Sequence, residues 1–156
     1  MAYYSGAQVN AAGSLIGILD TELVKNANWT IYDDSVGTNA KVYRCYDADD
    51  DTLFYWYVDD DVHTDYCQTK LYETWDAGTH TGTGGTSLYS NFRHKEGTYN
   101  ISLDDTQLIY IDQTAGYGNA CFVGRVKAVD PTMPQMIAIM AHVGNNYNYL
   151  DDIAVA

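Results

Sequence analysis

Basic residues are scarce in this chain of 156 residues: 8 Lys and Arg stand against 21 Asp and Glu, which gives a formal net charge of −13. A surface of this sign repels the phosphate backbone of nucleic acids, so we expect no nucleic-acid partner. Many acidic residues bracket one apolar run, and their spacing indicates charged turns at both ends of a strand. They are Asp47, Asp49, Asp50, Asp51, Asp59, Asp60, Asp61 and Asp65.

Cysteine and proline are also rare. The 3 cysteines, Cys45, Cys67 and Cys121, lie among strand-like residues without a Cys-x-x-Cys pair or a histidine at ligand spacing, so a zinc site has nothing to start from. They are predicted to be buried free thiols; an odd count also leaves room for one disulfide and a spare thiol, and spacing does not give the pairing. The 2 prolines, Pro131 and Pro134, lie together between the last two strand-like runs and interrupt neither.

Long hydrophobic runs are lacking as well. The most apolar stretch, Ala11–Leu19, has no basic residue before it and is ended by an aspartate, so it is neither a signal peptide nor a membrane span. We expect no membrane insertion. Apolar residues in this region recur at the three- and four-residue steps of an amphipathic helix; they are Ala12, Leu15, Ile16, Leu19, Leu23 and Val24. We predict one helix over about residues 10–26, capped by Asn10 or Ser14.

What the chain has in abundance is sequence typical of β-strands. It contains 15 tyrosines, and aromatic rings fit the pleated faces of sheets. β-Branched and aromatic runs alternate with polar breaks and predict about eight strands. These runs are the one that begins at Trp29, then Lys41–Tyr46, Leu53–Val58, Tyr66–Trp75, Thr98–Leu103, Leu108–Asp112, Ala120–Val126 and Ile137–His142. The prediction is a single mainly β domain over residues 1–156, an antiparallel β-sandwich or jelly-roll-like domain with one N-terminal α-helix.

Two details refine the predicted strands. The run Leu53–Val58 is apolar at every position, as expected of a central strand that is covered on both faces. The segments Asp33–Asn39 and Thr114–Asn119 each separate two strand-like runs and carry residues that accept turn dihedrals. Both therefore predict hairpin loops.

No residue pattern predicts catalysis or a cofactor. The nearest approach to a metal site is Asp47, Asp49 and Asp51, because a calcium loop gathers carboxylates at alternate positions. The pattern fails as an EF-hand, since Thr52 stands where the sharp turn requires glycine and Val58 where the bidentate glutamate belongs. A charged hairpin turn is expected there instead. The histidines are dispersed and match no nucleophile–base pattern; they are His63, His80, His94 and His142.

The segment Tyr72–Gly85 is the most distinctive part of the chain, because an aromatic strand end runs into a series of glycines and threonines. It is not a phosphate-binding loop, since no lysine follows its last glycine and no helix supplies a positive N-terminus. We predict an exposed connection without regular structure over about residues 77–87. This loop, or Met1–Gln8, is expected to contact a neighbouring subunit. The predicted interface residues are Trp75, Asp76, Gly78, Thr79, His80, Thr81, Gly82, Thr83 and Gly84.

Three features together resemble a group of virion structural proteins of tailed bacteriophages. They are a short helix leading into Asn28–Asp34, the run Tyr-Glu-Thr-Trp-Asp-Ala-Gly-Thr-His-Thr-Gly-Thr-Gly at Tyr72–Gly84, and the strand Phe122–Val126 ahead of a proline-containing turn. The resemblance spans most of the chain, from Leu15 to Ile139. It implies a non-enzymatic part of the head, neck or tail, found in the virion after assembly in the host cytoplasm. The implied partners are other virion proteins and further copies of the chain in a symmetric assembly.

Two other classes of protein fit parts of the sequence. A carbohydrate-binding β-sandwich that engages host-surface glycans would stack Tyr and Trp rings on sugars and use carboxylates to accept sugar hydroxyls. A calcium-dependent adhesion module would lose thermal stability when a chelator is added. The high tyrosine count and the run Asp59–Asp61 also leave open a specialised surface role, such as a decoration or fibre-like protein that meets the host envelope.

Overall fold

The computed structural model describes residues 1–9, 11–49, 52–63, 66–86, 90–93, 96–114, 117–126, 136–143 and 152–155. Within these residues one α-helix and one turn of 3-10 helix accompany a series of β-strands. In chain order the elements are β1 (Ala2–Gln8), α1 (Ser14–Glu22), η1 (Leu23–Lys25), β2 (Trp29–Gly37), β3 (Ala40–Asp47), β4 (Thr52–His63), β5 (Tyr66–Tyr72), β6 (Thr74–Asp76), β7 (Thr81–Thr83), β8 (Ser90–Arg93), β9 (Gly97–Leu103), β10 (Gln107–Thr114), β11 (Tyr117–Val126), β12 (Met136–Val143) and β13 (Asp152–Val155).

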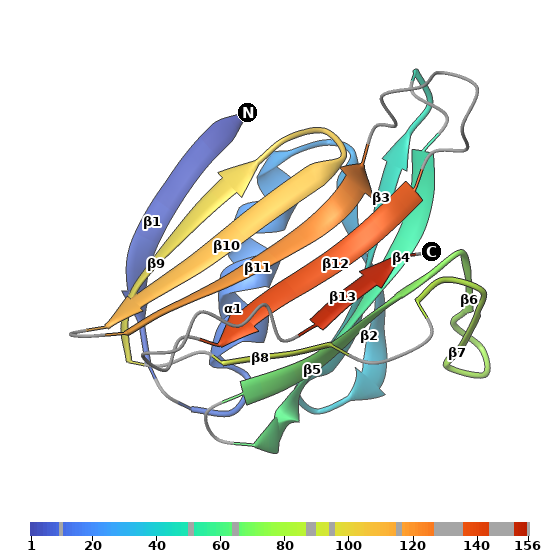
Figure 1. Ribbon diagram of the computed structural model, residues 1–156. Helices are drawn as coiled ribbons and strands as arrows, with labels where there is room; N and C mark the ends of the chain where they lie inside the picture. Colours follow the sequence, from blue (N-terminus) through green and yellow to red (C-terminus); the bar gives the residue numbers. More distant parts are fainter. Residues whose placement is uncertain are drawn as a thin grey trace.

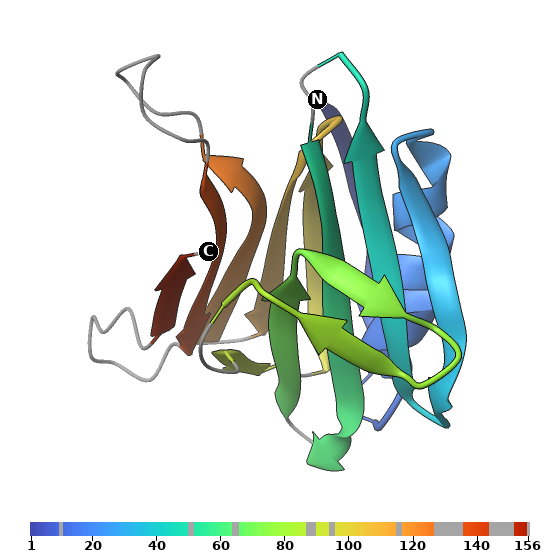
Figure 2. The ribbon, with the colours of Figure 1, turned by 90° about the vertical axis from the view of Figure 1, so that its right-hand side faces the viewer.

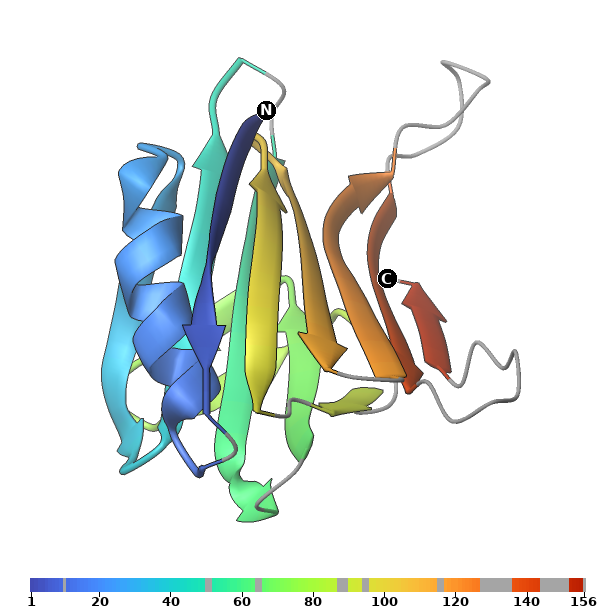
Figure 3. The same ribbon diagram turned by 90° about the vertical axis from the view of Figure 1, so that its left-hand side faces the viewer.

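The strands form two antiparallel sheets and a small separate hairpin. One sheet has six strands in the order β1-β9-β10-β11-β12-β13, and the other has five in the order β2-β3-β4-β5-β8. The six-stranded sheet lies in front in Figure 1, with the five-stranded sheet behind it. Helix α1 lies beside β1 and against the five-stranded sheet (Figure 3). The predicted antiparallel β-sandwich with one N-terminal helix is confirmed.

The helix is shorter than predicted and is capped from another element. The α-helical part covers Ser14–Glu22 and continues as the 3-10 turn η1, whereas about 10–26 was expected. The predicted cap Ser14 is the first residue of the helix, and Gly13 holds the N-cap position without a side-chain bond. The other predicted cap, Asn10, lies outside the described residues. Instead, Leu15 N–H donates to the Asp60 carboxylate of β4 at 3.0 Å. A carboxylate at this end also complements the helix dipole.

Helix α1 ties the two sheets together through two carboxylates. Asp20 accepts a hydrogen bond from the Tyr43 hydroxyl at 2.9 Å and an ion-paired bond from Lys41 at 2.6 Å, both from β3. Glu22, two residues further along the helix and almost fully buried, accepts from the Tyr99 hydroxyl of β9 at 3.0 Å. Because the buried Glu22 and the half-buried Asp20 both have partners, this polar layer costs little to bury.

The core is built from aliphatic and aromatic side chains of both sheets and the helix. Its largest fully buried members are Trp29, Trp56, Tyr43, Tyr110, Phe54, Leu15, Leu19, Leu23, Leu71, Ile101 and Leu103. The three cysteines are buried within it as free thiols, as predicted. Burial raises the pKa of the Cys45 thiol to about 12, so it carries no thiolate at neutral pH.

Several sequence predictions about the strands were wrong in detail. The run predicted over Tyr66–Trp75 is broken at Glu73 into β5 and β6. Most of the predicted loop Asp33–Asn39 belongs to β2, which extends to Gly37. The run Leu53–Val58 is not covered equally on both faces: Phe54, Trp56 and Val58 are fully buried, but Leu53 is exposed. The predicted loop Thr114–Asn119 is also too long, because β11 begins at Tyr117.

Four strands were not predicted at all: β1, β7, β8 and β13. Strands β1 and β7 contain glycine and small polar residues instead of an apolar–polar alternation, so their pairing partners, rather than local propensity, determine their structure. Strands β8 and β13 have four residues each, too few to show a period.

Candidate functional site

The segment predicted to be an irregular exposed connection is a β-hairpin. Strand β6 pairs with β7 in antiparallel register, with a turn over residues 77–80 between them. Thr74 lies opposite Thr83, Trp75 opposite Gly82 and Asp76 opposite Thr81. Figure 2 shows this hairpin lying across the outer face of the five-stranded sheet. The expectation that residues 77–87 lack regular structure is therefore wrong for residues 81–83, and the described part of this segment is ordered by specific contacts.

The glycines of this segment allow close packing. A side chain at Gly82 would meet the Tyr72 ring at 2.3 Å, so the ring lies directly on the bare backbone of β7. Gly84 and Gly85 adopt φ angles of 68° and 82°, where other residues are strained. At Gly85 a Cβ would also meet the Leu71 carbonyl at 2.2 Å. Glycine here lets the chain return closely to the end of β5. From the sequence alone, the same glycines are equally consistent with a flexible loop.

Backbone and threonine hydrogen bonds close the base of the hairpin. Glu73 N–H donates to the Thr83 carbonyl at 3.1 Å. Thr86 then pairs with the end of β5 in both directions: its N–H donates to the Leu71 carbonyl at 3.1 Å, and its hydroxyl accepts from Leu71 N–H at 3.2 Å. The two ends of the hairpin are thus held together at the edge of the sandwich.

Trp75 anchors the hairpin to the outer sheet face. Only 8% of Trp75 is exposed. Its ring stacks on Tyr57 of β4 with centroids 6.0 Å apart and planes at 23°, and it tilts against Tyr72 at 5.3 Å. Aromatic pairs in this range are stabilising beyond the area they bury. Trp75 was predicted to be an interface residue, and in the structure it forms an interface within the chain.

Asp33 of β2 is the polar partner of this anchor. Its side chain is 1% exposed. One carboxylate oxygen accepts from Trp75 Nε1 at 2.9 Å and lies 2.8 Å from His80 Nδ1. The other accepts from the Ser35 N–H at 3.1 Å and from the Ser35 hydroxyl at 3.0 Å. Burial by itself would raise the pKa of Asp33, but the hydrogen bonds from His80, Trp75 and Ser35 outweigh it and lower the pKa to about 2.

A β-bulge in β2 places Asp33 where the hairpin needs it. The pairing of β2 with β3 shifts between Ile31 and Asp33. The extra residue breaks the alternation of faces, so Tyr32 and Asp33 both point outward: Tyr32 packs on Tyr55 and Asp33 binds the hairpin. Asp33 does not stand out in the sequence, because the pair Asp33-Asp34 predicts part of a turn. Its signal is a pair of aspartates that directly continues the strand-like run Trp29–Tyr32.

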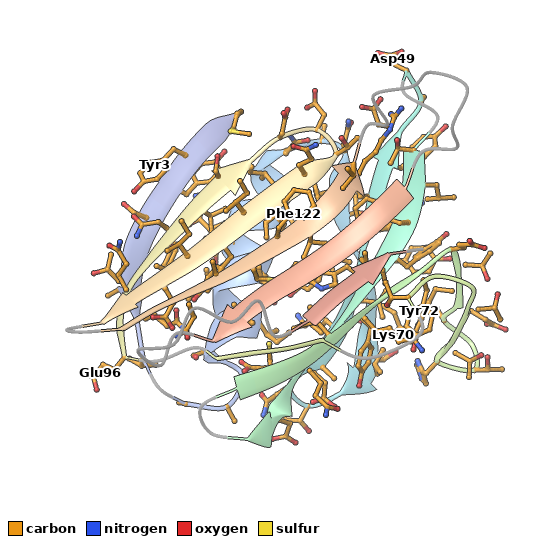
Figure 4. The ribbon with its side chains drawn as sticks, in the orientation of Figure 1. Tyr3, Asp49, Lys70, Tyr72, Glu96 and Phe122 are labelled. Carbon is orange, nitrogen blue, oxygen red and sulfur yellow. The ribbon has the colours of Figure 1, made fainter. Side chains whose placement is uncertain are left out.

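Beside the hairpin, the outer sheet face carries aromatic rings and cations. Tyr32 and Tyr55 meet edge to face at 4.9 Å, and the Arg44 guanidinium lies 5.7 Å from the Tyr32 ring. Lys70 lies 5.1 Å from the Tyr72 ring, and Figure 4 shows these two side chains next to the hairpin. This face therefore combines stacking surface with positive charge in a chain that is strongly acidic overall.

The tip of the hairpin is exposed, although it is internally bonded. Residues 76–81 are all exposed. Gly78 N–H donates to the Asp76 carboxylate at 2.8 Å, and the hydroxyls of Thr79 and Thr81 lie 2.7 Å apart. His80 adopts a left-handed φ of 53° and turns its ring back to Asp33, which connects the tip to the sheet.

The acidic turn between β3 and β4 was the nearest approach to a metal site. There the Asp47 carboxylate accepts from Asp49 N–H at 3.0 Å, which is a local turn bond, and Asp51 lies outside the described residues. Among the residues that the structure describes, no three histidine, cysteine, aspartate or glutamate side chains gather as metal ligands would. None of the described helices has the length and apolar character that crossing a membrane requires.

Comparison of the chain with protein-family models, curated proteins and solved structures finds no match. The geometry of the docked hairpin, with the sheet face beneath it, is therefore the basis for a functional proposal.

Proposed function

We propose that this protein is a non-enzymatic structural component of a tailed-phage virion that acts through protein–protein contacts in the assembled particle. One observation carries the proposal: the β6–β7 hairpin is tied to the sheet at Trp75 and Asp33 while its tip, residues 76–81, stays exposed. The tip is a projecting element that is ordered before any partner arrives.

Such a tip suits repeated contacts between subunits. A contact loop that is already ordered loses less conformational entropy when it binds. In a symmetric assembly the same contact forms many times, so a small gain per subunit is multiplied. The chemistry of the tip is compatible with a polar contact at the rim of an interface, because its exposed residues are small or polar: Asp76, Ala77, Gly78, Thr79, His80 and Thr81.

The resemblance to virion structural proteins supports the proposal from an independent direction. Its most distinctive run, Tyr72–Gly84, contains the hairpin itself together with the tyrosine that packs on Gly82. The proposed partners are other virion proteins and further copies of the chain, in the head–tail neck, the tail or a capsid decoration.

The outer sheet face favours a second candidate function, a carbohydrate-binding module that engages host-surface glycans. Tyr32 and Tyr55 offer rings beside Arg44, and pyranose rings stack on exposed aromatic faces. The two functions differ in one observable. A glycan-binding module binds host glycans as an isolated protein, whereas a structural component needs its neighbours in the particle.

Substitutions at the hairpin tip test the proposed function. We expect Thr79→Arg combined with Thr81→Arg to reduce incorporation into particles about tenfold, because two bulky charges at a packed contact cost on the order of 1.4 kcal/mol or more. Both side chains are exposed, so the fold should tolerate the change. Incorporation is measured by quantitative mass spectrometry of purified particles when the variant replaces the wild-type chain.

The matched control is Gln113→Arg, an exposed position on β10 of the other sheet. It adds the same side chain away from the hairpin and should leave incorporation unchanged. Equal incorporation of the tip variant and wild type would show that the tip is not a subunit contact.

A further inference from the structure

Strand β1 forms an open edge of the six-stranded sheet. It pairs with β9 over its whole length without a register shift: Ala2 lies opposite Leu103 at one end, and Gln8 lies opposite Gly97 at the other. Among the described residues, β9 is the only strand to which β1 is hydrogen-bonded. Figure 3 looks onto this side of the molecule and shows β1 in front, with no strand drawn beyond it. An edge of this kind is a template for pairing with another strand.

The other sheet edges carry features that discourage such pairing. Strand β2, at the edge of the five-stranded sheet, contains Asp33 and Asp34 and has two irregularities in its pairing. Strands β8 and β13 have only four residues each, and β8 packs against β12 and β13 of the facing sheet. Charges, bulges, shortness and cover are the usual means by which proteins protect an edge.

Strand β1 has none of these protections. Its sequence, Ala-Tyr-Tyr-Ser-Gly-Ala-Gln, lacks charged residues and proline. Two cations beside it already have partners: Lys25 lies over the Tyr4 ring at 4.4 Å and is ion-paired with Glu22, and the Met1 ammonium lies 4.0 Å from the Asp104 carboxylate. In a chain with a net charge of −13, an uncharged strand is where two copies approach with the least repulsion.

The side chains of β1 are also complementary to themselves. If two copies run antiparallel about a two-fold axis at Ser5, Tyr3 of one copy lies opposite Ala7 of the other. Tyr3 is 67% exposed, and together with Ser5 and Ala7 it belongs to the outward face of the strand. A large side chain therefore stands opposite a small one twice, which avoids a clash across the two-fold axis. The Tyr3 hydroxyl can keep its bond to the Asn100 side chain of β9 in this arrangement. Figure 4 shows Tyr3 at this outer edge of the sheet.

We propose that β1 pairs antiparallel with β1 of a second copy of this chain, which joins the two six-stranded sheets into one continuous sheet across a two-fold axis. The occupant is a second copy because the strand is uncharged and self-complementary about Ser5. This inference goes beyond the proposed function and does not depend on it, since it follows from the sheet edge alone.

A cysteine at the two-fold axis tests the pairing and its register. Ser5→Cys places two thiols opposite each other, within the Cα separation of roughly 4.4–6.8 Å that a disulfide spans. The native cysteines are fully buried and do not compete. With oxidised glutathione as the electron acceptor, this variant is expected to become mostly covalent dimer. The matched control, Gln113→Cys, is exposed on β10, two strands in from the edge, and should stay monomeric.

A second measurement does not depend on oxidation. Sedimentation velocity over a concentration series should show the wild-type chain as a dimer. Ser5→Lys should weaken dimerisation about fivefold or more, because like charges directly opposite each other across a strand pair are destabilising, whereas Gln113→Lys should leave it unchanged. A wild-type chain that stays monomeric, with no more disulfide at Ser5→Cys than at the control, would overturn self-pairing.

Discussion

Replacement of Asp33 by alanine is expected to lower the free energy of unfolding by about 2–4 kcal/mol, because it leaves buried donors without an acceptor. The Trp75 indole N–H and the Ser35 N–H both donate to this carboxylate. Chemical denaturation at neutral pH, followed by tryptophan fluorescence, measures the loss. The hairpin should also detach, so the amides of β6 and β7 should exchange with solvent much faster than in the wild type.

The pH dependence of stability tests whether the negative charge of Asp33 is the source of the stabilisation. Its pKa is about 2 in the folded protein, against an ordinary value of 3.8. Stability from a lowered pKa is complete above the unfolded value and is lost as the pH falls through the folded one. The wild type should therefore lose about 2 kcal/mol relative to Asp33→Asn between roughly pH 5 and pH 2.

Two controls make this result specific. Asp34→Ala removes the neighbouring carboxylate, which is exposed, and should change stability by less than about 0.5 kcal/mol. Asp33→Asn keeps an acceptor for Trp75 and should fall between the wild type and Asp33→Ala at neutral pH. An Asp33→Ala variant as stable as Asp34→Ala would show that the carboxylate does not hold the hairpin.

Replacement of Trp75 by alanine is expected to cost about 3–4 kcal/mol, since it removes a buried aromatic side chain and its stacking contact. Trp75→Phe should cost less, because the ring still packs on Tyr57 while the Nε1–H bond to Asp33 is lost. Stability is measured by denaturation, and docking of the hairpin by hydrogen exchange of its amides.

The effects of Trp75 and Asp33 should not add. Both changes release the same hairpin, so the double variant Asp33→Ala, Trp75→Ala should be less destabilised than the sum of the single variants, by about 1 kcal/mol or more. Strict additivity would contradict a shared anchor. Tyr46→Ala, at an exposed position on β3 outside the hairpin contacts, serves as the control for the loss of an aromatic side chain.

The sequence predicts those parts of the fold in which local pattern and tertiary packing agree. The helix follows from the recurrence of Leu15, Leu19 and Leu23, all of which are fully buried. The central strands follow from dense β-branched and aromatic runs, and the free buried cysteines from their strand-like neighbours. In these segments each residue is placed by the same period that defines the element.

The hairpin could not be predicted because its order depends on residues far away in the chain. A run of glycine and threonine has low strand propensity. Contacts such as the Tyr72 ring over Gly82, and the bond from Trp75 to the Asp33 carboxylate 42 positions before it, make this run regular. Asp33 itself depends on a bulge in β2, which changes the face of every following residue. Bulges of this kind leave little trace in a single sequence.

The hairpin tip and the β1 edge are different kinds of surface, and they lie on different sheets. The tip is an ordered polar projection over the five-stranded sheet, whereas β1 offers unprotected backbone at the edge of the six-stranded sheet. A subunit with two such surfaces can pair with its own copy at one and contact a different neighbour at the other. Symmetric particles are built from subunits with contacts of both kinds.

The composition of virus particles from the source of this chain tests the proposed function most directly. Quantitative mass spectrometry of particles banded twice in a density gradient is expected to find the chain at a constant ratio to the major capsid protein across preparations, because a structural component occupies symmetry-related positions. A chain that stays in the soluble fraction of the lysate and is missing from the banded particles would contradict the proposed function.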